Sequence, residues 1–274
     1  MDTYGFHTIH GRAPAIASGV KLANPDLSVW VVTGDGDGLS IGGNHTIHLL
    51  RRNLDINVML FNNRIYGLTK GQYSPTSEVG KVTKSTPMGS LDRPFNPLTL
   101  ALGAGATFVS RTIDKETKHL QEMIKKSHVH KGTSFMEIYQ NCNIFNDGAF
   151  SSLTDKETKS DTVLWLENNS PMVFGAEKNK GIRLDGNVPK VVKIGDKWSI
   201  DDILVHDESD YVIASLLSNM TYNEDFPDPI GVLYAIEDTT YEDMMVNQIK
   251  EATKKKAKGT IQDIINAGDT WVVK

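Results

Sequence analysis

The strongest constraint on the fold is a regular alternation of short apolar runs with helical patterns in the first half of the chain. The apolar runs occupy 27–33, 56–61, 106–110 and 134–139. Helical patterns extend over about 40–53 and 114–129. Short runs that are almost wholly apolar indicate strands buried on both faces, as in a parallel sheet with helical crossovers. The sequence therefore predicts an α/β fold with a doubly wound, mostly parallel sheet.

Polar residues follow two of these predicted strands directly. The first run ends in Gly34-Asp35-Gly36-Asp37-Gly38, and the second ends in Asn62-Asn63. Because the carboxyl ends of parallel strands meet at one edge of a sheet, we expect Asp35 and Asn63 to lie close together. Mg²⁺ prefers oxygen ligands, and a carboxylate, an amide oxygen and a backbone carbonyl at Ile65 would supply three. Glycines let a backbone approach phosphate oxygens, although a purely structural turn is the alternative.

The composition is that of an ordinary globular protein. Of the 274 residues, 39% are hydrophobic and 23% are charged, and the net charge is −5. No basic excess points to nucleic acid, and no apolar stretch approaches the roughly 20 residues of a membrane helix. Cys142 is the only cysteine, so an internal disulfide is excluded. We therefore expect a cytoplasmic protein with neither nucleic-acid nor membrane partners.

The character of the sequence changes after Cys142, where acidic and polar residues become frequent. We predict two domains, 1–150 and 151–274. Within the first, the segment 69–97 is rich in Gly, Ser, Thr and Pro, and a segment of this length without regular structure is usually functional. A strand is predicted near 189–194.

Two amphipathic helices are predicted near the end of the chain. Their capping boxes would pair Thr239 with Glu242 and Thr260 with Asp263. Isoleucines give the last helix an apolar face that we assign to the core or to a subunit interface, namely Ile261, Ile264 and Ile265.

The glycine-rich turn followed by the Asn-Asn pair is typical of thiamine-diphosphate enzymes, and longer stretches narrow the resemblance. The stretches 4–25, 34–53 and 61–77 resemble the beta subunit of 2-oxoacid:ferredoxin oxidoreductases. The similarity is strong from Met1 to about Asn146 and extends to the remainder only in overall layout. It implies the thiamine-diphosphate-binding fold in 1–150 and a smaller α+β extension in 151–274. The implied cofactors are thiamine diphosphate and Mg²⁺.

The resemblance also assigns roles to single residues. Asp35, Asn63 and the Ile65 carbonyl would hold Mg²⁺. The implied cofactor contacts are His10, Gly36, Asp37, Gly67 and Leu68. Substrate positioning would fall to His10, Leu68 and Lys70. A leucine at 68, with a lysine at 70 that can pair with a distal carboxylate, favours 2-oxoglutarate over pyruvate, while a solvated Lys70 is the alternative.

Cys142 resembles the last of four cysteines that hold a 4Fe-4S cluster in this family. Met1-Asp2-Thr3-Tyr4-Gly5 resembles the middle of a family segment that carries another of the four. We therefore expect the sequence to lack the N-terminal end of such a subunit, and we expect a cluster only if the missing cysteines exist. A natural lineage without the cluster is the alternative, and Cys142 would then be an inert core residue.

The function that the resemblance implies is oxidative decarboxylation of a 2-oxoacid to its acyl-coenzyme A, with electrons passed to ferredoxin. The expected partners are the alpha subunit, in a heterodimer, together with ferredoxin, the 2-oxoacid and coenzyme A. We expect no activity without the alpha subunit. The alternatives are a pyruvate-type enzyme of the same family, a truncated non-catalytic scaffold and a stand-alone thiamine-dependent decarboxylase.

Overall fold

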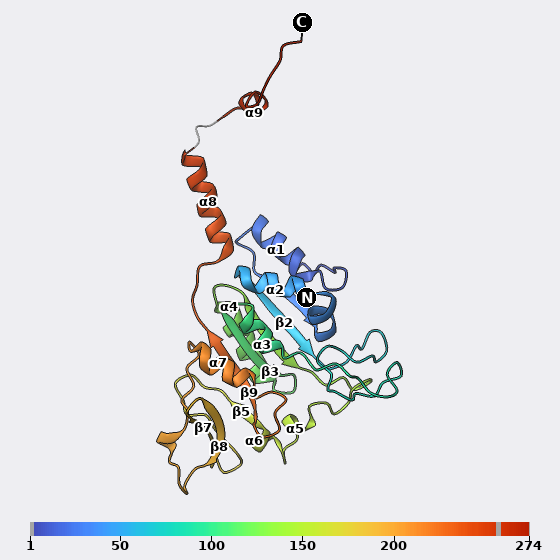
Figure 1. The fold of residues 1–274 in the computed structure, drawn as a ribbon, viewed down its shortest axis with the longest axis vertical. Helices are drawn as coiled ribbons and strands as arrows, with labels where there is room; N and C mark the ends of the chain where they lie inside the picture. The colour runs from blue at the N-terminus through green and yellow to red at the C-terminus, as the bar shows by residue number, and fades with distance from the viewer. Residues whose placement is uncertain (1–2, 256–258, 274) are drawn as a thin grey trace.

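A six-stranded sheet forms the centre of the computed structural model, which describes residues 3–255 and 259–273; Met1 and Asp2 lie outside these ranges. The strand order is β1-β2-β4-β3-β9-β5 (Figure 1). Four neighbouring strands pair in parallel: β1 (Val29–Gly34), β2 (Ile56–Asn62), β4 (Ser134–Tyr139) and β3 (Phe108–Ile113). β9 (Asp228–Ala235) runs antiparallel to β3, and β5 (Val163–Trp165) is parallel to β9. The predicted mostly parallel α/β sheet is confirmed.

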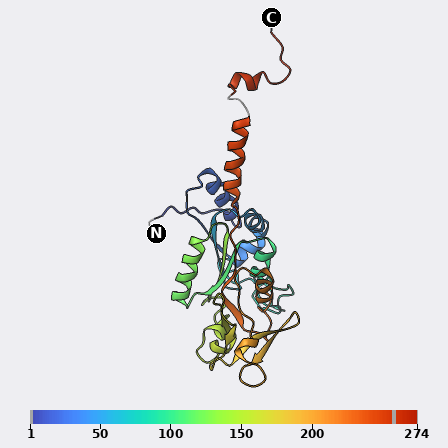
Figure 2. The same cartoon turned by 90° about the vertical axis from the view of Figure 1, so that its left-hand side faces the viewer.

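Helices cover both faces of this sheet. α4 (Thr117–Val129) lies on one face, and the opposite face carries α2 (Gly43–Arg52), α3 (Pro97–Gly103) and α7 (Tyr211–Ser218) (Figure 2). α1 (Ala13–Ala23) packs against β1 and α2. The larger core cluster lies between the sheet and α2, α3 and α7, while a smaller one beneath α4 contains Met123 and Met136. Burial of both sheet faces explains why the strands read as nearly continuous apolar runs.

The helix predicted from about residue 40 begins later than expected. A wide π-helical turn occupies Asp37–Ile41, and α2 starts at Gly43. The amide of Gly42 donates to the Asp37 carbonyl at 2.9 Å, and a Cβ at Gly42 would lie only 2.6 Å from that oxygen. The residue at 42 must therefore be a glycine for the chain to make this turn next to the end of β1.

The second half of the chain adds to the central sheet and builds a smaller one. β6 (Val173–Phe174), β7 (Lys180–Asp185) and β8 (Val188–Lys193) form an antiparallel sheet, and β8 matches the strand predicted near 189–194. Short helical turns connect these parts: α5 (Ser151–Thr154), α6 (Lys159–Thr162) and a 3₁₀ turn (Ile200–Asp202). Since β5 and β9 complete the sheet that the first half begins, the predicted boundary at 150 stays a prediction.

α8 (Tyr241–Lys255) extends away from the sheet, and α9 (Ile261–Ile265) follows it (Figures 1 and 2). The capping box of Thr260 with Asp263 is confirmed. The predicted pairing of Thr239 with Glu242 is wrong, because the Thr240 hydroxyl accepts from the Asp243 amide at 3.3 Å and Glu242 accepts from the Asp55 amide at 3.1 Å.

The three isoleucines of α9 are exposed, so they do not belong to the core of this chain, and their role at an interface stays a prediction. Among the described residues, no helix combines the length and the apolar character needed to span a membrane.

The buried β2 strand gives a direct test of the fold. Replacing Leu60, which is fully buried, by Ala is expected to lower the free energy of unfolding by about 2–5 kcal/mol, because it leaves a cavity in the core. Val32→Ala on the neighbouring β1 is the matched control, since Val32 is 63% exposed, and should change stability by less than about 0.5 kcal/mol. Denaturant unfolding followed by circular dichroism measures both, and equal effects would contradict this packing.

Candidate functional site

The structure brings Asp35 and Asn63 to the same edge of the sheet. Asp35 follows the last residue of β1 and Asn63 follows the last residue of β2, and the parallel register pairs Gly34 with Phe61. Burial raises the pKa of Asp35, and the backbone amide of Asn63, which lies near the carboxylate, partly offsets that rise. These two residues therefore lie at the carboxyl ends of the strands, where open parallel sheets bind their ligands.

The Asp35 carboxylate is almost completely buried, at 2% exposure. Burial raises the pKa of Asp35, while hydrogen bonds from Ser74 and Thr76 oppose that rise. The Ser74 and Thr76 hydroxyls both donate to Oδ2, at 2.5 and 2.6 Å. Among the described residues, no Lys, Arg or His side chain forms an ion pair with this carboxylate. A buried carboxylate in this setting fits a bound cation, which would compensate its negative charge.

Two further oxygen atoms fit such a cation. The Asn63 side-chain oxygen accepts one hydrogen bond, from the Ile65 amide at 3.3 Å. The Ile65 carbonyl accepts none from any described residue, although Ile65 is only 3% exposed. A carboxylate, an amide oxygen and a carbonyl are the kind of ligands that Mg²⁺ takes in proteins. The predicted ligand set therefore fits Mg²⁺, and its role stays a prediction.

Close packing fixes the glycine-rich turn next to Asp35. The Tyr66 hydroxyl donates to the Gly36 carbonyl at 3.0 Å, and a Cβ at Gly36 would lie 2.2 Å from the Tyr66 ring. The Asp37 carboxylate accepts from the Gly11 amide at 2.8 Å and from the Thr33 hydroxyl at 2.8 Å.

His10 is held at the same place, with its Nδ1 3.0 Å from Asp37 Oδ1. The structure thus places Gly36, Asp37 and His10 together. The Asp37 side chain is hydrogen-bonded to the turn at 10–11. Contacts of these three residues with a cofactor stay a prediction.

Gly67, Leu68 and Lys70 lie in a tight turn that follows Tyr66. The Lys70 amide donates to the Gly67 carbonyl at 3.0 Å. Leu68 is 82% exposed, and Lys70 is exposed with a φ of 74°. Because Tyr66 contacts Gly36, this turn is adjacent to the glycine-rich loop, and both side chains extend from it into solvent. Their predicted part in substrate positioning is not tested by the structure.

Cys142 is a partly exposed free thiol in the loop after β4. Its carbonyl accepts from the Asn146 amide at 2.9 Å, and the Asn146 side chain donates to the Asn63 carbonyl at 2.9 Å. Asn146 therefore connects the loop of the predicted cluster ligand with the loop of a predicted metal ligand. Cluster ligation by Cys142 stays a prediction.

Several residues near Asp35 were not expected from the sequence. Asn62 donates to Glu137 at 2.7 Å, and Arg111 donates to the same carboxylate at 2.7 Å. The Thr76 hydroxyl, which donates to Asp35, also lies 2.9 Å from the Asn62 side-chain oxygen. Asn62, Thr76, Glu137 and Arg111 are all fully buried. One signal existed, because Glu137 is the only charged residue in the apolar run SFMEIY.

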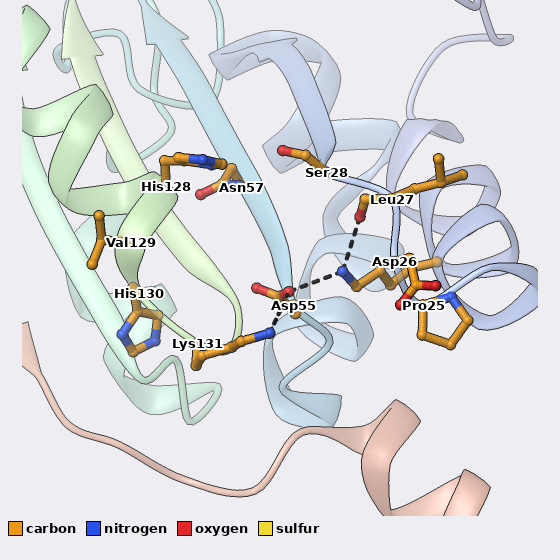
Figure 3. A pocket seen from close by; sticks show the side chains of 11 residues that line it. Pro25, Asp26, Leu27, Ser28, Asp55, Asn57, His128, Val129, His130 and Lys131 are labelled. Carbon is orange, nitrogen blue, oxygen red and sulfur yellow. Dashed lines mark hydrogen bonds and ion pairs between the residues drawn. The ribbon is translucent and has the colours of Figure 1, made fainter.

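A pocket of about 330 Å³ lies at the opposite ends of the strands (Figure 3). It is lined by residues before β1, around the start of β2 and at and after the end of α4, among them Ser28, Asn57 and His128. The buried Lys21 ammonium pairs there with Asp55 at 2.9 Å. Because Asn57 lies near the start of β2 and Asn62 at its end, this pocket is separate from the site around Asp35.

Comparison with known proteins defines the class. The family model of the thiamine pyrophosphate enzymes, C-terminal TPP binding domain, matches residues 1–138. The chain therefore contains a domain of the thiamine pyrophosphate enzymes, and the fold and the loops around Asp35 agree with that class.

Individual relatives narrow the class to one family. The chain is 51% identical to the 2-oxoglutarate oxidoreductase subunit KorB of Mycobacterium tuberculosis, over 100% of this chain and 74% of that protein. It is 49% identical to the 2-oxoacid:ferredoxin oxidoreductase subunit beta of Saccharolobus solfataricus, over 54% of this chain but only 48% of that subunit.

A solved structure agrees with these relatives. The 2-oxoglutarate:ferredoxin oxidoreductase from Magnetococcus marinus, with 2-oxoglutarate, coenzyme A and succinyl-CoA bound, superposes with a TM-score of 0.75 at 31% identity, over 98% of this chain and 77% of that one. The chain belongs to the beta subunits of the 2-oxoacid:ferredoxin oxidoreductases.

The contact between Gly36 and Tyr66 gives a second test. Gly36→Ala is expected to lower the free energy of unfolding by about 1–3 kcal/mol, because the new methyl group would overlap the Tyr66 ring. Adding Tyr66→Ala should relieve the overlap, so the double variant should lose less than the sum of the single changes. Gly43→Ala is the control, since no atom lies within 4 Å of a Cβ there. Thermal unfolding measures the two single variants Gly36→Ala and Tyr66→Ala, the double variant and the control. Strict additivity of the two single changes would contradict the contact.

Proposed function

We propose that this chain binds thiamine diphosphate through Mg²⁺ and serves, with an alpha subunit, in the oxidative decarboxylation of 2-oxoglutarate to its acyl-coenzyme A. The observation that carries the proposal is the buried Asp35 carboxylate, which forms no ion pair with a described residue and lies beside Asn63 and an Ile65 carbonyl that accepts no hydrogen bond from a described residue. Membership of the family and the matched thiamine pyrophosphate domain support it. Ferredoxin is the proposed acceptor of the two electrons that the reaction releases.

Within this proposal the chain's own residues bind and orient. Asp35, Asn63 and the Ile65 carbonyl hold the cation that neutralises the diphosphate, and the turn at 34–38 lets the backbone approach it. Bound thiamine diphosphate supplies an electron sink for the electron pair that remains when carbon dioxide leaves a 2-oxoacid. Asp37 fixes the turn at 10–11 and keeps His10 at the edge of the site.

The choice of 2-oxoglutarate rests on the turn after Tyr66. Lys70 is exposed and forms no ion pair with a described residue, so its ammonium is available to a second carboxylate on the substrate. The M. tuberculosis and M. marinus relatives are named for 2-oxoglutarate, which supports this choice. A pyruvate-type enzyme is the second candidate. It is favoured if Lys70 is only a solvated lysine, because pyruvate has no distal carboxylate that could pair with Lys70.

Cys142 is proposed as one ligand of a 4Fe-4S cluster. The loop that carries it is connected through Asn146 to the Asn63 loop, which supports a place near the cofactor. Cys142 is the only cysteine of the given sequence, so the other ligands would have to come from outside it. Catalysis is proposed to require the alpha subunit, and turnover of a 2-oxoacid by the chain alone would overturn that.

Replacing Asp35 by Asn tests the cofactor site. The change keeps the size of the side chain and removes its charge, so we expect at least about a 100-fold loss of affinity for thiamine diphosphate with Mg²⁺. Isothermal titration calorimetry measures the affinity, and Asp26→Asn on the exposed surface is the control. Unchanged binding by a folded Asp35→Asn variant would exclude this residue as the metal ligand.

Replacing Lys70 by Gln tests the substrate class. If Lys70 pairs with the distal carboxylate, KM for 2-oxoglutarate should rise by about 10-fold or more while kcat changes little. The reason is that the lost interaction stabilises the bound ground state and the transition state equally. Lys84→Gln, in the exposed part of the following loop, is the control. The assay uses the assembled enzyme with both 2-oxoglutarate and pyruvate. An equal effect on the two substrates would contradict pairing of Lys70 with the distal carboxylate and would favour Lys70 as an ordinary solvated lysine.

A further inference from the structure

Both hydroxyl groups near Asp35 donate to the same carboxylate oxygen. Ser74 and Thr76, from the loop after the turn at 67–70, reach Oδ2 at 2.5 and 2.6 Å. Both are as deeply buried as Asp35 itself, at 2% and 0% exposure. No side chain of the described residues donates to the other oxygen, Oδ1, although the backbone amide of Asn63 also lies near the carboxylate. The two oxygens of one carboxylate therefore have different surroundings.

The Thr76 hydroxyl has a second buried acceptor within reach. Its hydroxyl has one hydrogen and two acceptors, Asp35 Oδ2 at 2.6 Å and Asn62 Oδ1 at 2.9 Å. The shorter distance is typical of a hydroxyl that donates to a charged carboxylate. Asn62 Oδ1 also accepts from the Arg64 amide at 3.2 Å, so it keeps a donor when Thr76 donates to Asp35.

The orientation of Asn62 is set from the other side. Its amide nitrogen donates to Glu137 Oε1 at 2.7 Å, and an ionised carboxylate only accepts hydrogen bonds. Glu137 is held in turn by Arg111, whose Nε donates to Oε2 at 2.7 Å. Hydrogen bonds therefore join Arg111 at the centre of the sheet to Asn62 at the end of β2, and Asn62 Oδ1 lies next to the Thr76 hydroxyl that donates to Asp35.

We propose that Ser74 and Thr76 are positioning residues that hold the Asp35 carboxylate by Oδ2 and leave Oδ1 to bind the divalent cation. The inference rests on the proposed function, because it takes Asp35 as the Mg²⁺ ligand. Mg²⁺ requires near-ideal octahedral geometry, so a carboxylate that is already fixed binds it better than one that rotates freely.

Groups that orient a metal ligand typically contribute 10- to 100-fold to metal affinity. Thr76→Val keeps the shape of the side chain and removes the hydroxyl, so it should raise the Kd for the cation by about that factor. Thr76→Ser keeps the hydroxyl and should stay within about 3-fold of the native value. Thr112→Val is the matched control, because Thr112 is also fully buried and its hydroxyl bonds, among the described residues, to His119 at 2.8 Å.

The experiment uses the full chain co-expressed with its alpha subunit. Mn²⁺ is titrated in the presence of thiamine diphosphate, and electron paramagnetic resonance reports free and bound Mn²⁺ independently of turnover. We expect the weakened binding in Thr76→Val, near-native binding in Thr76→Ser and native binding in Thr112→Val. Circular dichroism confirms that each variant is folded.

Two results would overturn the proposal in distinguishable ways. If Thr76→Val binds Mn²⁺ as tightly as Thr112→Val, the positioning role is wrong and the proposed cofactor site stands. If the native complex itself binds no Mn²⁺ with thiamine diphosphate, the proposed function fails together with the positioning role. Ser74→Ala provides a second variant should Thr76→Val not fold, and native binding by a folded Ser74→Ala would also overturn the proposal.

Discussion

The ion pair between Arg111 and Glu137 is the interaction on which the centre of the structure depends. The two residues face each other in the parallel register of β3 and β4, and both are fully buried. Burial alone would lower the pKa of Arg111, but Glu137 and neighbouring acidic groups raise it above its ordinary value. Two charges are costly to remove from water, so each must be satisfied by good partners.

Those partners connect the centre of the sheet with its ligand-binding edge. Arg111 also donates to Thr221 at 2.7 Å and lies 3.6 Å from Asp228, both in the second half of the chain. Glu137 accepts from Asn62, the last residue of β2. The hydrogen bonds and ion pairs that assemble the sheet thus also reach Asn62 at the edge of the site, and they include residues beyond position 150.

The sequence predicted the parallel strands and the meeting of Asp35 with Asn63, because apolar runs and strand-end polar residues are local signals. It did not predict β5 and β9 in the same sheet, since their pairing depends on contacts between distant segments. Ser74 and Thr76 also escaped prediction. They lie in a loop whose functional importance was expected, but no periodicity indicates which hydroxyls turn inward to Asp35.

Arg64 lies between Asn63 and Ile65, and it has a left-handed backbone with a φ of 55°. Its guanidinium stacks over Tyr139, Phe150 and Tyr222, with 4.6 Å to the Phe150 ring centre. Aromatic rings from three separate segments thereby stabilise the unfavourable backbone conformation of Arg64 in this loop. The loop is consequently preorganised, so the binding of a ligand there requires little loss of conformational entropy from the chain.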